Sequence, residues 1–282
     1  MNYRHGFHAG NFADVVKHAV LSRIIVHLRA KPAPFRVIDT HAGAGLYDLA
    51  GPQASRTGEW REGIARVLNA PLAPAVRALL APYLDAVAAF NSPGSLAVYP
   101  GSPLLLRKWL RPRDRLIACE LEPAAAAALA NNLGSGARAK ALTMDGWTAL
   151  SAYVPPKERR GLVLLDPPFE AADEFTRLAE AFAQAHRKWA TGIYLLWYPI
   201  KDRSGPDALA KRLKRLRISR ILRAELTISP QPAASRLTGC GLIVVNPPWT
   251  LEGELALLLP ALAGLLSQRE GGFRLDWLAG EK

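Results

Sequence analysis

Residues 161–166 are the stretch that most restricts the fold of this chain. Four consecutive aliphatic residues, Leu162 to Leu165, lead directly into Asp166. A strand without a polar face is buried on both sides, as in parallel sheets covered by helices. Similar segments alternate along the chain, with strands expected at 35–39, 115–120, 138–143 and 191–198 and helices at 104–110, 124–130, 171–188 and 251–267. We therefore predict an α/β fold with a mainly parallel sheet and helices on both faces.

The composition excludes several classes of protein. The 282 residues are 50% hydrophobic, which is too apolar for a disordered chain. Two cysteines, Cys119 and Cys240, do not make a disulfide framework, and neither lies in a CxxC pair that would hold zinc. The longest apolar stretch, residues 255–266, is interrupted by Pro260 and is shorter than the ~20 residues of a membrane span. We expect a cytoplasmic protein without a membrane partner, and a monomer.

The predicted elements divide the chain into three parts. Residues 1–46 contain an N-terminal motif, a first helix capped by Asn11, and the first strand of the sheet domain. Residues 47–98 are expected to form an inserted helical subdomain, because apolar residues recur there at helical spacing. Residues 99–282 supply the remainder of the sheet domain.

Three further expectations concern local structure. Pro82 lies within a helical pattern of the insertion and predicts a kink or a break. Residues 219–228 and 240–246 flank a Pro/Ser loop and are predicted to pair as antiparallel strands. The chain is expected to finish in a short apolar tail at 273–278.

The sharpest chemical signal is Asp166-Pro167-Pro168-Phe169, at the carboxyl end of the buried strand. Ligands of open α/β sheets bind at such strand ends. The prolines fix the backbone, so that the Pro167 carbonyl and the Asp166 carboxylate are two aimed acceptors, while Phe169 offers a ring for stacking. Two acceptors and a ring suit a planar amine such as the exocyclic amine of adenine. The alternative is a strand-end turn in which the aspartate caps the next helix.

A second tetrapeptide imitates this motif. Asn246-Pro247-Pro248-Trp249 also follows an apolar strand and also offers an acceptor, two prolines and a ring. We favour Asp166 as the active motif, because its strand falls in the middle of the alternating series. Asn246 follows the predicted terminal hairpin, toward the far edge of the sheet.

The expected cofactor side consists of small or acidic residues at successive strand ends. The turn from His41 to Gly45 allows close approach of a ligand to the backbone at Gly43. Glu120 ends the next strand, where an acid typically accepts hydrogen bonds from ribose hydroxyls. Asp145-Gly146 follows the third strand, where an acid suits the adenine amine of a nucleoside cofactor. A P-loop is excluded, because the chain has no GxxxxGK[ST].

Histidines and a lysine near the N-terminus admit two interpretations. His5, His8, Asp14 and His41 include the residue types that bind metals, but we favour a role as polar lining and predict no metal. Lys17, next to His18 on the first helix, is placed to meet a carboxylate or phosphate, or else lies on a solvated helix face.

Positive charge is concentrated between Lys201 and Arg223. Nine basic and two acidic residues give this segment +7 of the chain's net charge of +12. Such a patch binds phosphates without reading sequence. We expect an RNA-docking surface beside the adenine pocket, with Lys211, Arg212, Lys214 and Arg215 as substrate contacts; the alternative is a solvated helix face.

The motifs together resemble those of the bacterial RlmJ family of 23S ribosomal RNA adenine-N6 methyltransferases. The resemblance extends over essentially the whole chain and rests on these segments: residues 3–11, 39–45, 99–103, 166–169, 197–199 and 246–249. It implies a Rossmann-like methyltransferase fold that uses S-adenosylmethionine. It places cofactor contacts on His18, His41, Ser102, Glu120, Asp145, Gly146 and Asp166, to which we add Lys17 and Gly43.

The resemblance also implies a substrate site. Asp166 would be the catalytic acceptor, and Tyr3 would contact the substrate; we add the adjacent Arg4 as a further substrate contact. The family commonly has tyrosine where this chain has Phe169, so stacking is kept and a hydroxyl contact is lost. The expected reaction is methyl transfer to the N6 amine of an adenosine in 23S ribosomal RNA. Adenine in DNA, a protein glutamine amide and an inactive RNA-binding module remain alternatives.

Overall fold

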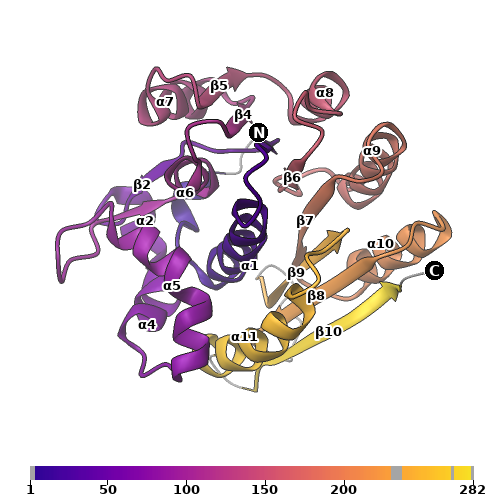
Figure 1. Ribbon diagram of the computed structural model, residues 1–282. Coiled ribbons are helices and arrows are strands. Elements are labelled where there is room, and N and C mark those ends of the chain that lie inside the picture. The colour runs from indigo at the N-terminus through magenta and orange to yellow at the C-terminus, as the bar shows by residue number, and fades with distance from the viewer. Residues whose placement is uncertain (1–3, 230–236, 268–269, 281–282) are drawn as a thin grey trace.

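The computed structural model describes residues 4–229, 237–267 and 270–280. Its centre is an eight-stranded sheet of order β10-β8-β9-β7-β6-β1-β4-β5 (Figure 1). The strands are β1 (Arg36–Asp39), β4 (Arg115–Glu120), β5 (Ala139–Thr143), β6 (Gly161–Leu165), β7 (Ile193–Ile200), β8 (Ile221–Thr227), β9 (Gly239–Val245) and β10 (Gly272–Ala279). Strands β5, β4, β1, β6 and β7 are parallel neighbours, whereas β9 is antiparallel to β7 and β8, and β10 to β8. The mainly parallel sheet is confirmed.

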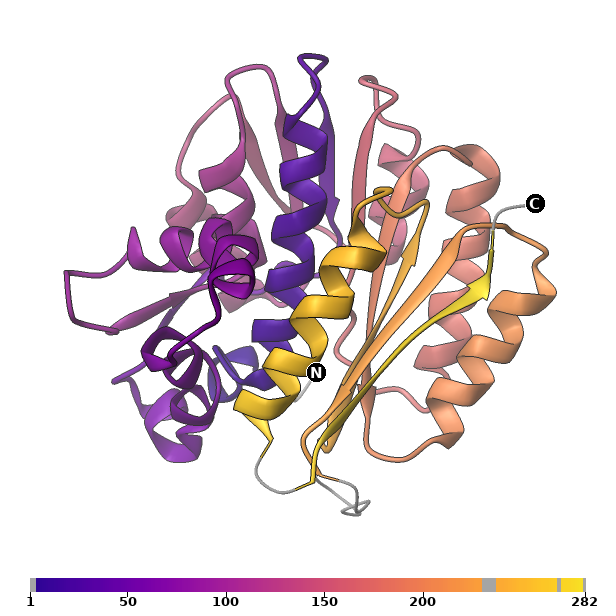
Figure 2. The same ribbon diagram turned by 60° about the horizontal axis from the view of Figure 1, so that its bottom comes forward.

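Alternation along β6 explains why helices cover both faces of the sheet. Leu162 and Leu164 belong to one core cluster, together with buried residues of the helices α1 (Phe12–Arg29) and α11 (Leu251–Leu266). Val163 and Leu165 belong to a second core cluster, together with buried residues of α9 (Glu174–Lys188) and α10 (Ser204–Arg215). Figure 2 shows the helices on the two sides of the sheet. The principal helices are α1 (Phe12–Arg29), α6 (Ser102–Trp109), α7 (Pro123–Leu133), α8 (Gly146–Tyr153), α9 (Glu174–Lys188), α10 (Ser204–Arg215) and α11 (Leu251–Leu266).

The segment expected as an insertion begins and ends at a small two-stranded sheet, in which Leu46 pairs with Pro100. Its elements are β2 (Leu46–Asp48), α2 (Pro52–Thr57), α3 (Glu59–Glu62), α4 (Ile64–Asn69), α5 (Pro74–Ala88) and β3 (Val98–Pro100). The buried residues Ile64, Leu80 and Tyr83 join the same core cluster as α1. The helical segment therefore packs on the sheet domain through a shared core.

Two local expectations need correction. Of the kink or break expected at Pro82, the break is wrong, because helix α5 continues through this proline. In the turn before Pro82, Arg23 donates to the Leu79 carbonyl. The apolar tail is a strand, β10, which pairs with β8 at the edge of the sheet. The antiparallel pairing of β8 with β9 is confirmed.

The N-terminal cap of α1 is as expected. The Asn11 side chain accepts hydrogen bonds from the backbone N–H groups of Ala13 and Asp14, both at 3.0 Å. Within the described ranges, none of the helices combines the length and apolar character needed to cross a membrane.

Candidate active site

A cavity of about 1110 Å³ opens at the edge where the parallel strands end. Thr40 after β1, Glu120 on β4, Asp145 after β5 and Asp166 after β6 all reach it. Carboxyl ends of parallel strands meet at one edge, so residues far apart in sequence converge there. The expected site residues that line the cavity are Arg4, Lys17, His18, His41, Gly43, Ser102, Glu120, Asp145, Gly146, Asp166, Pro167 and Phe169.

Other expected site residues do not line this cavity. Tyr3 lies outside the described residues. The basic residues Lys211, Arg212, Lys214 and Arg215 belong to the carboxyl-terminal half of α10 and are absent from the cavity wall. Because α10 follows a parallel strand, it runs back toward the opposite edge of the sheet. The expectation that this cluster lies beside the pocket is therefore wrong.

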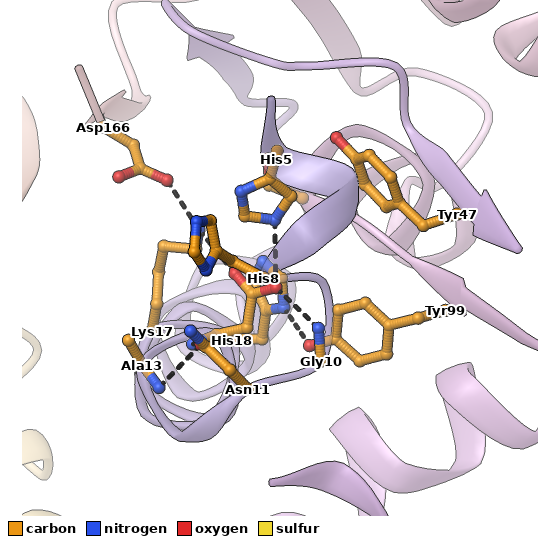
Figure 3. A network of polar contacts seen from close by, with 12 residues as sticks. His5, His8, Gly10, Asn11, Ala13, Lys17, His18, Tyr47, Tyr99 and Asp166 are labelled. Atoms are coloured by element: carbon orange, nitrogen blue, oxygen red, sulfur yellow. Dashed lines mark hydrogen bonds and ion pairs between the residues drawn. The ribbon is translucent and has the colours of Figure 1, made fainter. Parts of the chain in front are cut away.

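Asp166 is held by a buried lysine from the first helix. The Lys17 ammonium lies 2.5 Å from Asp166 Oδ2 (Figure 3). It also lies 2.9 Å from Asp14 Oδ1. Burial by itself lowers the pKa of Lys17, but the two carboxylates outweigh it and raise that pKa well above its ordinary value. The lysine is therefore charged, and it engages one oxygen of Asp166. Of the two interpretations of Lys17, contact with a carboxylate is the one observed.

Asp14 joins the N-terminal motif to this pair. Its Oδ2 accepts from the Gly10 N–H at 2.9 Å and lies 3.0 Å from His5 Nε2. Burial alone raises the pKa of Asp14, but His5 and Lys17 oppose it and hold the pKa well below its ordinary value. A charged network thus runs from the N-terminal segment through Lys17 to Asp166.

His18 is a buried residue of the cavity wall and is neutral. Its Nδ1 lies 2.6 Å from the Tyr99 hydroxyl, which in turn lies 2.9 Å from the Tyr83 hydroxyl. Burial, together with the charge of Lys17, lowers the pKa of His18 to about 3. Its Nε2 is buried and has no partner among the described residues.

His41 is also neutral, and its contacts fix its tautomer. The Thr40 hydroxyl donates to the Leu164 carbonyl at 2.9 Å and lies 2.8 Å from His41 Nδ1. Since that hydroxyl proton is committed to Leu164, His41 Nδ1 is the donor and its Nε2 is left as an acceptor. Burial lowers the pKa of His41 to about 4.

Glu120 and Asp145 are both fixed by backbone contacts. Glu120 Oε2 accepts from the Gly43 N–H at 2.9 Å, and Oε1 accepts from the Leu121 and Glu122 N–H groups at 2.8 Å. Asp145 caps α8 and accepts from Thr148 through Oδ2 alone. Each carboxylate therefore keeps lone pairs for a ligand.

Asp39, at the end of β1, is a buried acid bonded to the cavity residue Ser102, a contact that the sequence interpretation missed. It is fully buried, and its Oδ2 accepts from the Ser102 hydroxyl at 2.7 Å. Burial raises the pKa of Asp39 to about 7, although the Ser102 hydrogen bond opposes the shift. Its Oδ1 has no partner among the described residues. A signal existed, since an acid ending the first strand directly precedes the glycine turn.

The raised pKa of Asp39 predicts a pH-dependent effect of Asp39→Asn. Between about pH 4 and its folded-state pKa of about 7 the carboxyl is protonated in the folded protein but ionised in the unfolded chain. Its stabilising contribution is therefore full at pH below about 4 and lost as the pH rises through about 7. Asparagine imitates the protonated form, so it should stabilise the protein relative to wild type at pH 8 more than at pH 5. Urea unfolding at both pH values measures this; parallel pH profiles would contradict it.

An aromatic wall stands beside Asp166. The Phe169 ring centroid lies 4.8 Å from that of Phe175 and 5.8 Å from that of Trp197, and both pairs are inclined. Phe169 has a positive φ of 52°, a conformation that bulky residues seldom adopt. Trp197 also lines the cavity. Its place in the cavity wall was not predicted, because periodicity presents it only as a strand residue.

The second tetrapeptide serves a structural turn at the opposite edge. The Asn246 amide donates to the carbonyls of Ala190 and Gly192, both at 2.8 Å, and so ties the end of β9 to the start of β7. Because β9 runs antiparallel to β7, its carboxyl end points away from the cavity. Strand direction separates Asn246 from the site. Its strand is not at the far edge, as expected, but lies between β7 and β8.

His8 is tied to the inserted helices. Its Nδ1 lies 3.0 Å from Glu59 Oε2, to which the Asn11 amide also donates. The hydrogen bond to Glu59 raises the pKa of His8. In the parts of the chain that the structure describes, no group of three or more His, Cys, Asp or Glu side chains is arranged to hold a metal.

Comparisons with known proteins agree with one another. A family model described as "Ribosomal RNA large subunit methyltransferase D, RlmJ" matches residues 32–279. Relatives named "Ribosomal RNA large subunit methyltransferase J" from Escherichia coli (strain K12) and Haemophilus influenzae are 41% and 37% identical, each over 100% of both chains. The crystal structure of protein LPL1258 from Legionella pneumophila is similar with a TM-score of 0.86 and 33% identity, covering 98% of this chain and 99% of the other.

Proposed function

This chain belongs to the RlmJ family of ribosomal RNA large subunit methyltransferases, and on that premise we propose that it transfers a methyl group from S-adenosylmethionine to the N6 amine of an adenosine in 23S ribosomal RNA. Family membership confirms the resemblance inferred from the motifs, the methyltransferase fold and the assignment as an enzyme. The cofactor, the methylated atom and the site residues belong to the proposal.

One observation supports the proposal most directly. Asp166 directly follows strand β6 and is itself followed by two prolines. It lines the cavity, and one of its carboxylate oxygens is engaged by Lys17. Because Lys17 occupies Oδ2, Oδ1 is available to accept one N–H of a substrate amine. The Pro167 carbonyl is a second acceptor whose direction the proline ring helps to fix.

The residues around the cavity fit S-adenosylmethionine. Glu120 and Asp145 each keep acceptor capacity, as a ribose diol and an adenine amine require. Gly43 lines the cavity with a positive φ of 63°, and a side chain there would collide with the Tyr47 hydroxyl, so this turn of the cavity wall requires glycine. A cavity of about 1110 Å³ exceeds the size typical of sites for one small ligand, which suits a cofactor and a base together.

When bound, S-adenosylmethionine supplies a methyl group that its sulfonium charge makes electrophilic. The protein residues act on the amine. Hydrogen bonds to Asp166 and the Pro167 carbonyl favour a pyramidal nitrogen, whose lone pair is no longer delocalised into the base. The Lys17 ammonium engages Oδ2 of Asp166, so Oδ1 is the oxygen that can accept a hydrogen bond from the amine.

Phe169 and Trp197 position the base. Two inclined rings at a centroid distance of 5.8 Å form a wall beside the acceptors, on which an unstacked adenine can lie. The target nucleotide has to leave its own stack to reach this wall. The Phe169 ring retains the stacking surface that a tyrosine would provide.

The test is transfer of labelled methyl groups to separate pools of protein-free 23S ribosomal RNA, DNA and ribosomal protein, followed by mass analysis of the modified nucleoside. We expect N6-methyladenosine in the RNA pool alone. Label in DNA or protein only, or in RNA at another atom, would overturn the proposal. A binding titration with S-adenosylmethionine checks the cofactor separately.

A further inference from the structure

The edge of the sheet opposite the cavity carries an unusual excess of positive charge. Six connections lead from a helix into a strand at this edge, and all six strands (β1, β4, β5, β6, β7 and β8) run in the same direction; the connections are visible at the top of Figure 2. Taken from the last four residues of each helix to the first residue of the next strand, they are residues 26–36, 106–115, 130–139, 150–161, 185–193 and 212–221. We call these six connections the basic edge.

The basic edge contains most of the chain's positive charge. It holds 19 of the 36 Lys and Arg residues but only two of the 24 Asp and Glu residues, a net charge of +17. The remaining sequence has 17 basic and 22 acidic residues, a net charge of −5. The described cavity wall is acidic as well, with nine Asp or Glu and four Lys or Arg side chains. A polyanion is therefore attracted to the basic edge and not to the mouth of the cavity.

The two acids of the basic edge are already neutralised within it. Asp114 is fully buried and bound by Arg111 at 2.8 Å, and Glu158 is bound by Arg36 at 2.9 Å. Many of the other basic side chains are exposed, among them Lys31, Arg113, Lys157, Arg187 and Lys214. Their charge is directed to solvent rather than used inside the fold.

The helix dipole explains part of this positive charge. Cations in the last turn of a helix are stabilised by the helix dipole, and eight of the 19 basic residues lie there. The other 11 lie beyond the helix ends, where the dipole effect falls off. The helix dipole therefore does not explain why these 11 basic residues are gathered at this edge.

Hydrogen bonds between neighbouring connections join them into one continuous surface. Arg111 donates to the Lys31 and Ala33 carbonyls at 2.7 and 3.0 Å. Arg160 also donates to the Ala33 carbonyl at 3.0 Å, so three connections meet at one point. At the other end, Asn246 holds the start of β7. With neighbouring strands ~4.8 Å apart, seven adjacent strand ends give an edge about 30 Å wide.

Trp249 adds an aromatic side chain to this edge. It follows β9, whose carboxyl end lies between the starts of β7 and β8, and its side chain is 84% exposed. Exposed aromatic rings beside basic side chains are typical of surfaces on which nucleic acid bases stack. A single exposed tryptophan elsewhere on the surface would need no explanation. At the basic edge, Trp249 is a second feature, besides the charge, that indicates a nucleic-acid-binding surface.

We propose that the basic edge is a docking surface for the phosphate backbone of RNA, remote from the cavity that takes the target base. The choice of RNA over another polyanion rests on the proposed function. Helix α9 alone, with 15 residues at 1.5 Å each, separates the two edges by about 22 Å. The RNA that is methylated therefore contacts the protein at two places, and the distant contact supplies affinity without reading sequence.

The test uses a variant in which four exposed charges from four connections are removed: Lys31→Gln, Arg113→Gln, Lys157→Gln and Arg187→Gln. Binding of a protein-free 23S ribosomal RNA transcript is measured over a series of KCl concentrations without S-adenosylmethionine. Four lost phosphate contacts should reduce the slope of log K against log salt by about three, and should raise Kd at least about tenfold at ~0.1 M salt. The matched control exchanges Lys and Arg at the same four positions and should keep the wild-type slope.

Two results would overturn the inference. One is unchanged RNA affinity and slope in the glutamine variant. The other is binding of phosphatidylserine vesicles that the variant loses while its RNA binding is unchanged, which would assign the edge to a lipid surface. Because binding is measured without methyl transfer, a wild-type protein that binds RNA through this edge but transfers no methyl group would contradict the proposed function alone.

Discussion

Replacing Asp166 by asparagine is expected to lower the rate of methyl transfer about 10²- to 10³-fold, the effect of losing one aimed hydrogen-bonding group at a reacting centre. The reason lies in Lys17. Its ammonium needs an acceptor at 2.5 Å, so the new amide would turn its oxygen toward Lys17 and its NH2 toward the substrate amine. Two donors would then face each other. Single-turnover transfer to 23S ribosomal RNA measures the loss.

The controls separate chemistry from folding and cofactor binding. Lys17 keeps its contact with Asp14 in the variant, so the thermal midpoint should change little. Binding of S-adenosylmethionine, measured by calorimetry, should persist. Transfer at the wild-type rate would show that Asp166 is not the acceptor of the amine.

Replacing Lys17 by methionine should abolish detectable transfer and lower the free energy of unfolding by about 3 kcal/mol. The side chain of Asp14 is 2% exposed and would lose its cation while remaining buried, which is the costly way to break an ion pair. Urea unfolding at pH 7 measures the stability. The matched control is Lys201→Met, an exposed lysine of the same cavity, for which a change within about 0.5 kcal/mol is expected.

The Lys17 variant should also respond differently to acid. The pKa of Asp14 is held well below its ordinary value in the folded protein, so its stabilising contribution is present at neutral pH and is lost as the pH falls below about 4. Without Lys17 this acid-dependent loss should shrink. Equal stability of the two proteins at pH 7 would contradict the ion-pair interpretation.

The features that sequence reasoning predicted are those that follow from one strand at a time. The aliphatic run 162–165 requires a strand buried on both faces, and an acid directly after such a strand has to emerge at the ligand-binding edge. Glu120 and Asp145 obey the same rule and reach the cavity. Element type and strand direction were enough to bring these residues together.

The sequence could not show which side chains of different helices and strands contact one another. Lys17 and Asp166 are 149 residues apart, and their contact depends on how α1 packs against the sheet. The buried Asp39 was missed because its raised pKa depends on its surroundings, which no motif encodes. Pro82 was expected to kink or break its helix, but α5 continues through it, and no local pattern predicted that Arg23 of α1 would donate to the Leu79 carbonyl in the preceding turn.

The opposed charges of the two sheet edges make the molecule a strong electric dipole. One edge has a net charge of +17, and the rest of the chain, with the cavity at the other edge, has −5. In the electric field of a polyanion such a molecule is oriented before contact, so that the basic edge faces the polyanion. Orientation of this kind acts beyond contact distance and weakens as salt shortens the Debye length to ~10 Å at 0.1 M. The enzyme would therefore meet a large anionic particle with its active site facing away, and the target strand has to come round to it.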